Sequence, residues 1–218
     1  MNQFIDKLGM IGEDHIATSL ETPLRIDAFE LNDHLKIELI EKHFKEIMYI
    51  LGLDLNDDSL SGTPHRVAKM YVKEIFSGLN PANKPSVKLF ENKYQYNEML
   101  IEKNITLFTY CEHHFVPIIG KVHVAYISNG QVIGLSKINR LVQYYAKRPQ
   151  VQERLTSQIA EGLKEALKSD DVAVIIDAAH LCVASRGIED TNSSTITASY
   201  SGKFQKEKMK NEFFSLIK

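Results

Sequence analysis

Two short segments concentrate the residue types that bind metal ions. They are Cys111-Glu112-His113-His114 and His180-Leu181-Cys182, which hold both cysteines and three of the 8 histidines of the chain. Thiolate and imidazole groups suit zinc, and Cys-x-x-His spacing lets two ligands reach one ion while a distant ligand joins a second strand to it. Single cysteines and histidines are more often structural, but their clustering here predicts a zinc site.

Five side chains are more than one zinc ion needs. We assign Cys111, His114 and Cys182 as ligands, because thiolates bind strongly and one residue per strand is easier to aim than an adjacent pair. His113 and His180 then remain beside the metal as proton carriers, since the reference pKa of imidazole is close to neutral. A structural site uses four ligands and a catalytic site three, and the spacing alone leaves both open.

Positive side chains at helical spacing are candidates for binding phosphate. One group opens a predicted helix, where free backbone N–H groups and cations one turn apart suit an anion. The candidates are Ser136, Lys137, Arg140, Arg186, Arg66 and Lys69. The alternative for each is an ordinary solvated helix face.

Gln152-Glu153 begins a long predicted helix after Pro149. An acid there suits the helix dipole, and it is also placed to accept hydrogen bonds from the ring N–H and amino group of a guanine. Adenine does not offer that donor pair. The sequence holds no Walker loop, so side chains would have to hold a nucleotide.

The elements that must position these residues follow from hydrophobic periodicity. Helices are predicted over 33–51, 63–77, 136–146 and 151–168 and around 213–217. In the second, Thr63 is the expected N-cap and Gly78 the expected stop. Strands are predicted over 105–110, 121–127, 131–135, 172–184 and 195–204, with Asn129-Gly130 turning the second into the third as an antiparallel hairpin.

The order strand, strand, helix, helix, strand, strand predicts an α+β fold, with a four-stranded antiparallel sheet and a helix pair on one face. Proline and polar residues between 80 and 92 suggest a boundary. We therefore expect an N-terminal arm over 1–32, with at most one short helix, a helical region over 33–92 and a catalytic domain over 93–218. Open sheet edges are usually shared between subunits, which predicts a homo-oligomer.

Composition excludes several classes of protein. Among 218 residues, 26 basic and 28 acidic side chains leave a formal charge of -2, which gives no support for binding nucleic acid or anionic membranes. Two cysteines cannot build a disulfide framework, and neither a signal core nor an apolar span is present. We expect a soluble cytoplasmic protein.

Several motifs in order resemble the GTP cyclohydrolase I family. They are Thr63-Pro64-x-Arg66-Val67-Ala68-Lys69-Met70-Tyr71, Cys111 to Pro117, Gly134-Leu135-Ser136-Lys137-x-x-Arg140, Arg148 to Glu153, and His180-Leu181-Cys182 with Arg186-Gly187. The resemblance runs from about residue 33 to the C-terminus. It implies the tunnelling fold (T-fold) and a toroidal homodecamer with active sites between subunits.

The resemblance also implies a role for each matching residue. Zn²⁺ is held by Cys111, His114 and Cys182, with His113, His180 and Ser136 catalytic. Glu153, with Gln152 beside it, anchors guanine. The remaining cations, Lys137, Arg140, Arg186, Arg66 and Lys69, surround the ribose and triphosphate, the last two reaching in from another subunit.

The implied reaction is the first step of pterin and tetrahydrofolate biosynthesis. Water activated by zinc attacks carbon 8 of GTP, formate leaves, and the ribose rearranges to give 7,8-dihydroneopterin triphosphate. Two rival interpretations are a structural zinc protein that senses nucleotide, and the nitrile reductases of related fold. A nucleotide sensor would give His113 and His180 no role. A nitrile reductase uses a cysteine nucleophile, whereas the cysteines of this chain have the spacing of metal ligands.

Overall fold

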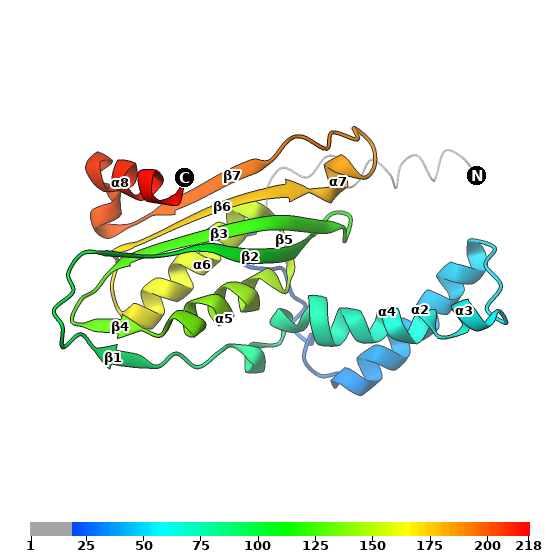
Figure 1. Ribbon diagram of the computed structural model, residues 1–218. Helices are drawn as coiled ribbons and strands as arrows, with labels where there is room; N and C mark the ends of the chain where they lie inside the picture. The colour runs from blue at the N-terminus through cyan, green and yellow to red at the C-terminus, as the bar shows by residue number, and fades with distance from the viewer. Residues whose placement is uncertain (1–18) are drawn as a thin grey trace.

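A central mixed sheet organises residues 19–218, which are the part of the chain that the computed structural model describes (Figure 1). Its strand order is β5-β2-β3-β6-β7. The four long strands, all antiparallel, are β2 (Met99–Cys111), β3 (Pro117–Ile127), β6 (Val172–His180) and β7 (Thr195–Tyr200). The fifth, β5 (Pro149–Gln150), runs parallel to the end of β2. The predicted α+β class and antiparallel strands are confirmed, but the sheet has five strands because the short link between two helices joins it.

The predicted helix pair covers one face of this sheet (Figure 1). It consists of α5 (Leu135–Ala146) and α6 (Gln152–Leu167), and Leu155, Ile159 and Leu163 of α6 are completely buried. Lys168 ends α6 in the left-handed conformation, with φ of 50°. The main hydrophobic core lies between these helices and the sheet, where β6 contributes a nearly continuous apolar run.

The opposite face of the sheet is partly covered by the C-terminal segment. The predicted last helix is present as α8 (Glu207–Ile217), preceded by a 3-10 turn, η4 (Gly202–Gln205). Phe204 and Phe213 are fully buried and form a second core cluster with Met99, Ala125 and Ile175. The sheet is thus covered by α5 and α6 on one side and in part by α8 on the other.

The helical N-terminal region lies beyond one end of the sheet (Figure 1). It contains α2 (Asp33–Ile50), capped by the Asn32 side chain and followed by Gly52 at φ of 82°, then α3 (Asp58–Ser61) and α4 (Thr63–Met70). The first predicted helix is therefore confirmed. Residues 1–18 lie outside the described part, and residues 19–32 form turns and no helix.

The observed second helix differs from the predicted one at both ends. Gly62, and not Thr63, is the N-cap of α4, while the Thr63 hydroxyl accepts a hydrogen bond from Arg66. The α-helix ends at Met70 and continues as a π-helix, η1 (Tyr71–Ile75), and a 3-10 turn, η2 (Ser77–Leu79). Gly78 does not stop the helix. It allows a close approach, because a Cβ atom there would lie 2.0 Å from the Tyr144 carbonyl oxygen.

The predicted hairpin at Asn129-Gly130 was wrong in its pairing. Strand β4 (Gln131–Ile133) pairs antiparallel with β1 (Leu89–Glu91) and forms a separate two-stranded sheet. Only Gly130 has positive φ in this turn, at 79°, whereas a two-residue type I′ turn needs it at both central positions. The polar stretch of residues 80–92 therefore holds a 3-10 turn, η3 (Pro81–Asn83), and then a strand.

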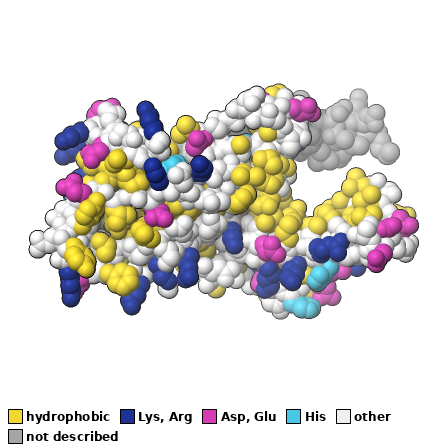
Figure 2. All heavy atoms as spheres, in the orientation of Figure 1, with side chains coloured by type: hydrophobic (Ala, Val, Ile, Leu, Met, Phe, Trp, Pro, Cys, Tyr) yellow, Lys and Arg dark blue, Asp and Glu magenta, His cyan; other side chains and the backbone are white. Residues whose placement is uncertain are grey.

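Two predicted strands are shorter than expected. The strand predicted over 172–184 ends at His180 and gives way to a helical turn, α7 (Leu181–Ala184), so Cys182 lies on that turn. The strand predicted over 195–204 ends at Tyr200. Within the described residues, no helix has the length and apolarity needed to cross a membrane. Basic and acidic side chains are interspersed over the face drawn in Figure 2, in keeping with the small net charge.

Candidate active site

Three side chains meet at one end of the central sheet as a group that can hold a metal ion. Cys111 ends β2, His114 follows in the next turn and Cys182 lies on α7. Their donor atoms all lie within 4.8 Å of one another, and Cys111 Sγ is 3.9 Å from His114 Nδ1. Donors about 2.0 to 2.3 Å from a tetrahedral zinc ion are roughly 3.3 to 3.8 Å apart, so small adjustments suffice. Three ligands leave a fourth position open, as catalytic sites do.

Sheet pairing explains why segments so distant in sequence meet. Ile118 of β3 pairs with His180 of β6, which brings the two segments to the same sheet end. The turn after β2 is closed by hydrogen bonds from Cys111 N to Val116 O at 2.9 Å and from Phe115 N to Cys111 O at 2.8 Å. Phe115 also packs on Phe76, with ring centroids 5.0 Å apart. The residues 111–116, here called the metal loop, are therefore held by both the sheet and the N-terminal region.

The electrostatics of the two cysteines favour a bound cation. Burial and the neighbouring Cys111 raise the pKa of the Cys182 thiol, while Arg186 opposes that rise. Two thiolates side by side repel each other in a partly buried place, and a divalent cation removes that repulsion and stabilises both. The donor set therefore fits zinc chemistry.

The two histidines predicted as proton carriers are His113, which contacts this group, and His180, which lies two residues before Cys182 in the sequence. His113 Nδ1 is 3.7 Å from Cys111 Sγ, and His113 Nε2 is 3.8 Å from Glu112 Oε1. His180, the last residue of β6, is half-buried, and that burial lowers its pKa, with Glu153 opposing. A neutral imidazole near pH 7 is suited to accept and return a proton.

Gln152 is 1% exposed and lies behind His180. Its Nε2 atom donates to Thr195 O at 2.8 Å and to Thr197 Oγ1 at 3.1 Å, and its Oε1 lies 2.8 Å from His180 Nε2. A carbonyl can only accept, so the amide orientation is fixed and His180 Nε2 must carry the hydrogen. Proton exchange is then left to His180 Nδ1. Sequence reasoning placed Gln152 beside guanine and did not detect this contact, because β7 supplies the partners.

The candidate phosphate-binding group on α5 lies away from the metal loop. Asn139, one turn along α5, donates to Glu102 Oε1 at 3.3 Å. At about 3.3 Å per residue, the stretch of β2 from Glu102 to Cys111 measures roughly 25 to 30 Å. Ser136, Lys137 and Arg140 of the same chain therefore do not reach the metal loop.

The other predicted phosphate-binding cations lie in two places, after α7 and in the helical N-terminal region. Arg186 follows α7 and interacts electrostatically with Cys182. Arg66 donates to Ser59 O at 3.2 Å and to Thr63 Oγ1 at 2.9 Å in the N-terminal region, where Lys69 also lies exposed on α4. Glu153 is exposed in the first turn of α6, at the same sheet end as His180.

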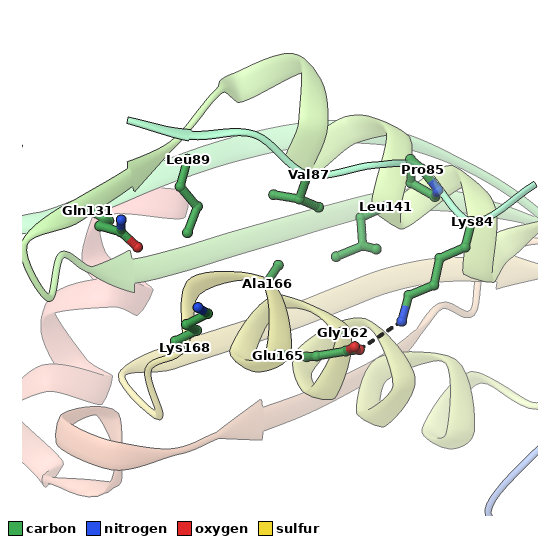
Figure 3. Close-up of a pocket in the computed structure, with 10 residues that line it drawn as sticks. All are labelled: Lys84, Pro85, Val87, Leu89, Gln131, Leu141, Gly162, Glu165, Ala166 and Lys168. Atoms are coloured by element: carbon green, nitrogen blue, oxygen red, sulfur yellow. Dashed lines mark hydrogen bonds and ion pairs between the residues drawn. The ribbon is translucent and has the colours of Figure 1, made fainter. Parts of the chain in front are cut away.

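A separate hollow of about 450 Å³ lies between β1 and the helices α5 and α6 (Figure 3). It is lined by apolar side chains such as Val87, Leu89 and Leu141, and Lys84 closes one side through a 2.7 Å ion pair with Glu165. None of its lining residues is a cysteine or histidine. This hollow is therefore separate from the candidate metal ligands.

The fold and the site define an α+β protein in which three side chains that could hold a metal ion converge, with His113 in contact with Cys111 and His180 two residues before Cys182. A family model described as GTP cyclohydrolase I matches residues 40–218. The GTP cyclohydrolase 1 of Flavobacterium johnsoniae is 59% identical over 213 residues, covering 98% of this chain and 96% of the relative. The GTP cyclohydrolase 1 of Citrobacter koseri is 50% identical over 219 residues, which cover 100% of this chain and 99% of the relative. That of Escherichia coli K12 is 52% identical over 210 residues, which cover 96% of this chain and 95% of the relative. The chain belongs to the GTP cyclohydrolase I family.

Proposed function

We propose that this chain is a zinc-dependent GTP cyclohydrolase that opens the imidazole ring of GTP, releases formate and forms 7,8-dihydroneopterin triphosphate. This is the first step toward pterins and tetrahydrofolate. Family membership over nearly the whole chain supports the reaction. The observation that carries the proposal is the convergence of Cys111, His114 and Cys182, with His113 and His180 alongside.

Zinc held by the three ligands would supply Lewis acidity that activates water near neutral pH. His180 contributes a proton carrier beside the guanine imidazole: because its Nε2–H is directed at Gln152, its Nδ1 atom first accepts a proton and then passes it on. His113, next to the metal loop ligands, is the second proton carrier. Ser136 assists proton movement during the ribose rearrangement.

Recognition of the substrate is divided between its two ends. The exposed carboxylate of Glu153 accepts from the guanine ring N–H and amino group. The triphosphate and ribose are held by Lys137, Arg140, Arg186, Arg66 and Lys69. In one chain Ser136, Lys137 and Arg140 lie away from the metal loop, so we propose that a neighbouring subunit supplies these three residues, as the resemblance implies for Arg66 and Lys69.

The exposed edges and faces of the chain support self-association. One edge of β7 has no partner strand among the described residues, and α2 exposes large apolar side chains, including Ile47 at 48% and Ile50 at 79%. Open edges and apolar helix faces are commonly closed by other subunits. We propose a homo-oligomer with shared active sites, of the toroidal decamer type, in the cytoplasm.

Incubation of the purified protein with GTP tests the proposal. We expect one formate per GTP and a pterin that fluoresces after oxidation, together with stoichiometric zinc by metal analysis. ATP serves as the control, because it lacks the donor pair that Glu153 recognises. GTP that binds and remains intact would favour a nucleotide sensor, and reduction of a nitrile with a nicotinamide cofactor would favour the related reductases.

A further inference from the structure

Arg154 is an almost fully buried cation next to the proposed guanine anchor. Its side chain is 3% exposed, and it donates from Nη2 to the Glu112 carboxylate and, at 3.1 Å, to Pro149 O. Its Nε donates to Gln150 Oε1 at 3.0 Å. One guanidinium therefore joins the start of α6, the short strand β5 and the metal loop.

Helix formation does not explain why a buried arginine occupies this position. Arg154 is the third residue of α6, where the helix dipole favours acids and disfavours cations. A buried arginine also loses its hydration, which only well-placed acceptors can offset. An arginine that is unfavourable both for the helix dipole and for its own hydration must be stabilised by a tertiary contact. The charged group that Arg154 contacts is the carboxylate of Glu112.

Glu112 stands between the proposed ligand Cys111 and the proposed proton carrier His113. Its side chain is 19% exposed, and while one carboxylate oxygen meets Arg154, the other lies 3.8 Å from His113 Nε2. Its backbone N–H donates to Gln150 O at 3.0 Å. Both the side chain and the backbone of Glu112 are thus fixed by residues of the α6 and β5 side.

The support behind this contact is itself buried. The Gln150 side chain donates to Tyr145 O and to Gln158 Oε1, both at 2.9 Å, and the Gln158 amide donates to Glu21 at 2.8 Å. Gln150 has no exposed surface and Gln158 is 4% exposed. Arg154 is therefore itself held by a buried hydrogen-bond network when it contacts Glu112 of the metal loop.

We propose that Arg154 is a positioning residue which, through Glu112, holds the metal loop so that Cys111 and His114 face Cys182. This rests on the proposed metal site. Residues that orient metal ligands typically change metal affinity by about 10- to 100-fold when they are removed. Arg154 does not touch the metal ligands directly, so its effect passes through Glu112.

Zinc affinity, measured by competition with a chromophoric chelator on the full-length protein, tests this role. Arg154→Met should weaken zinc binding by about 10- to 100-fold. Arg154→Lys keeps the charge but not the planar fork and should recover only part of the loss. Glu112→Gln should weaken binding similarly, and combining it with Arg154→Met should add little, since both remove the same contact.

Gln158→Met is the matched control. It breaks an outer contact of the same network and should lower thermal stability, but Gln150 keeps its contacts with Tyr145 and Arg154, so the Arg154–Glu112 pair stays in place and zinc affinity should remain at the wild-type value. If Arg154→Met does not fold, Arg154→Lys and Glu112→Gln still decide the outcome. Wild-type zinc affinity in these variants would overturn the positioning role while leaving the proposed function intact. A wild-type protein that binds no zinc would overturn both.

Discussion

Gln152 connects the start of α6 to His180 and offers a direct test of how the site is built. Replacement by Leu keeps the size but leaves His180 Nε2 and Thr195 O without their 2.8 Å partners, while Thr197 keeps its contact with Thr156. A fully buried polar group left unpaired costs about 1 to 3 kcal/mol, and because both of these groups are only partly buried, stability should fall by about 1 to 3 kcal/mol in all. For a chain of this size, that lowers Tm by roughly 2 to 12 °C.

The catalytic effect should appear in kcat. An acid–base group contributes about 10²- to 10⁴-fold, and losing only its orientation should cost about 10- to 100-fold in kcat. KM for GTP should stay near its wild-type value, because the Gln152 amide is enclosed and bonded to β7 and His180. The assay follows formate and oxidised pterin fluorescence well below the Tm of the variant.

Thr156→Val provides the matched control. The Thr156 hydroxyl belongs to the same buried cluster, 2.7 Å from Gln152 O, but no hydrogen bond joins it to His180. Its loss should reduce stability and leave kcat close to wild type. A Gln152→Leu enzyme with unchanged kcat and a raised KM would refute the positioning role and would favour direct contact with guanine.

Three further predictions concern the metal, subunit sharing and pH. Cys182→Ser should lose zinc and turnover together, and a zinc-free variant that keeps full activity would contradict the assignment. Inactive Cys111→Ser and Arg140→Ala chains, dissociated and reassembled at equal amounts, should regain activity at roughly one quarter of the sites, because intact residues from two chains then meet by chance. No recovery would argue that each chain holds a complete site. Burial lowers the pKa of His123, with Lys121 adding to the effect and Asp177 opposing it, so stability should be lost as pH falls below about 6.5, where the unfolded chain takes up the proton first. His123→Gln should lose less stability than wild type between pH 7.5 and 5.5 in thermal unfolding, and equal losses would contradict this.

The group of candidate metal ligands could be predicted in part from the sequence because residue chemistry is local. Cys111 and His114 lie three positions apart, and their donor atoms meet after a single turn. The helices α5 and α6 were predictable for a similar reason, since each buries apolar side chains at helical spacing, and α2 was predictable from the same spacing although Met48 is its only buried residue. Positions near element ends were less predictable, as the change from α4 to a π-helix at Tyr71 shows.

Errors arose where a long-range contact overrides a local preference. Asn129-Gly130 favours a tight hairpin, but β4 pairs with β1, about 40 residues earlier in the chain, and only Gly130 adopts positive φ. A glycine such as Gly78 after an amphipathic pattern typically ends a helix. Here it is needed because the backbone at the end of α5 approaches so closely that no side chain fits. Neither partner can be inferred from the residues around the motif.

The sequence by itself determined which groups can perform chemistry: two thiols and neighbouring imidazoles for a metal, and an acid and several cations for a nucleotide. Only the tertiary structure decided how they are arranged. It aligned β3 with β6 so that Cys182 meets Cys111, placed Gln152 behind His180, and separated Arg140 from the metal loop. The physical reason is that residue type sets what a side chain can donate or accept, while strand pairing and burial set which partner it meets.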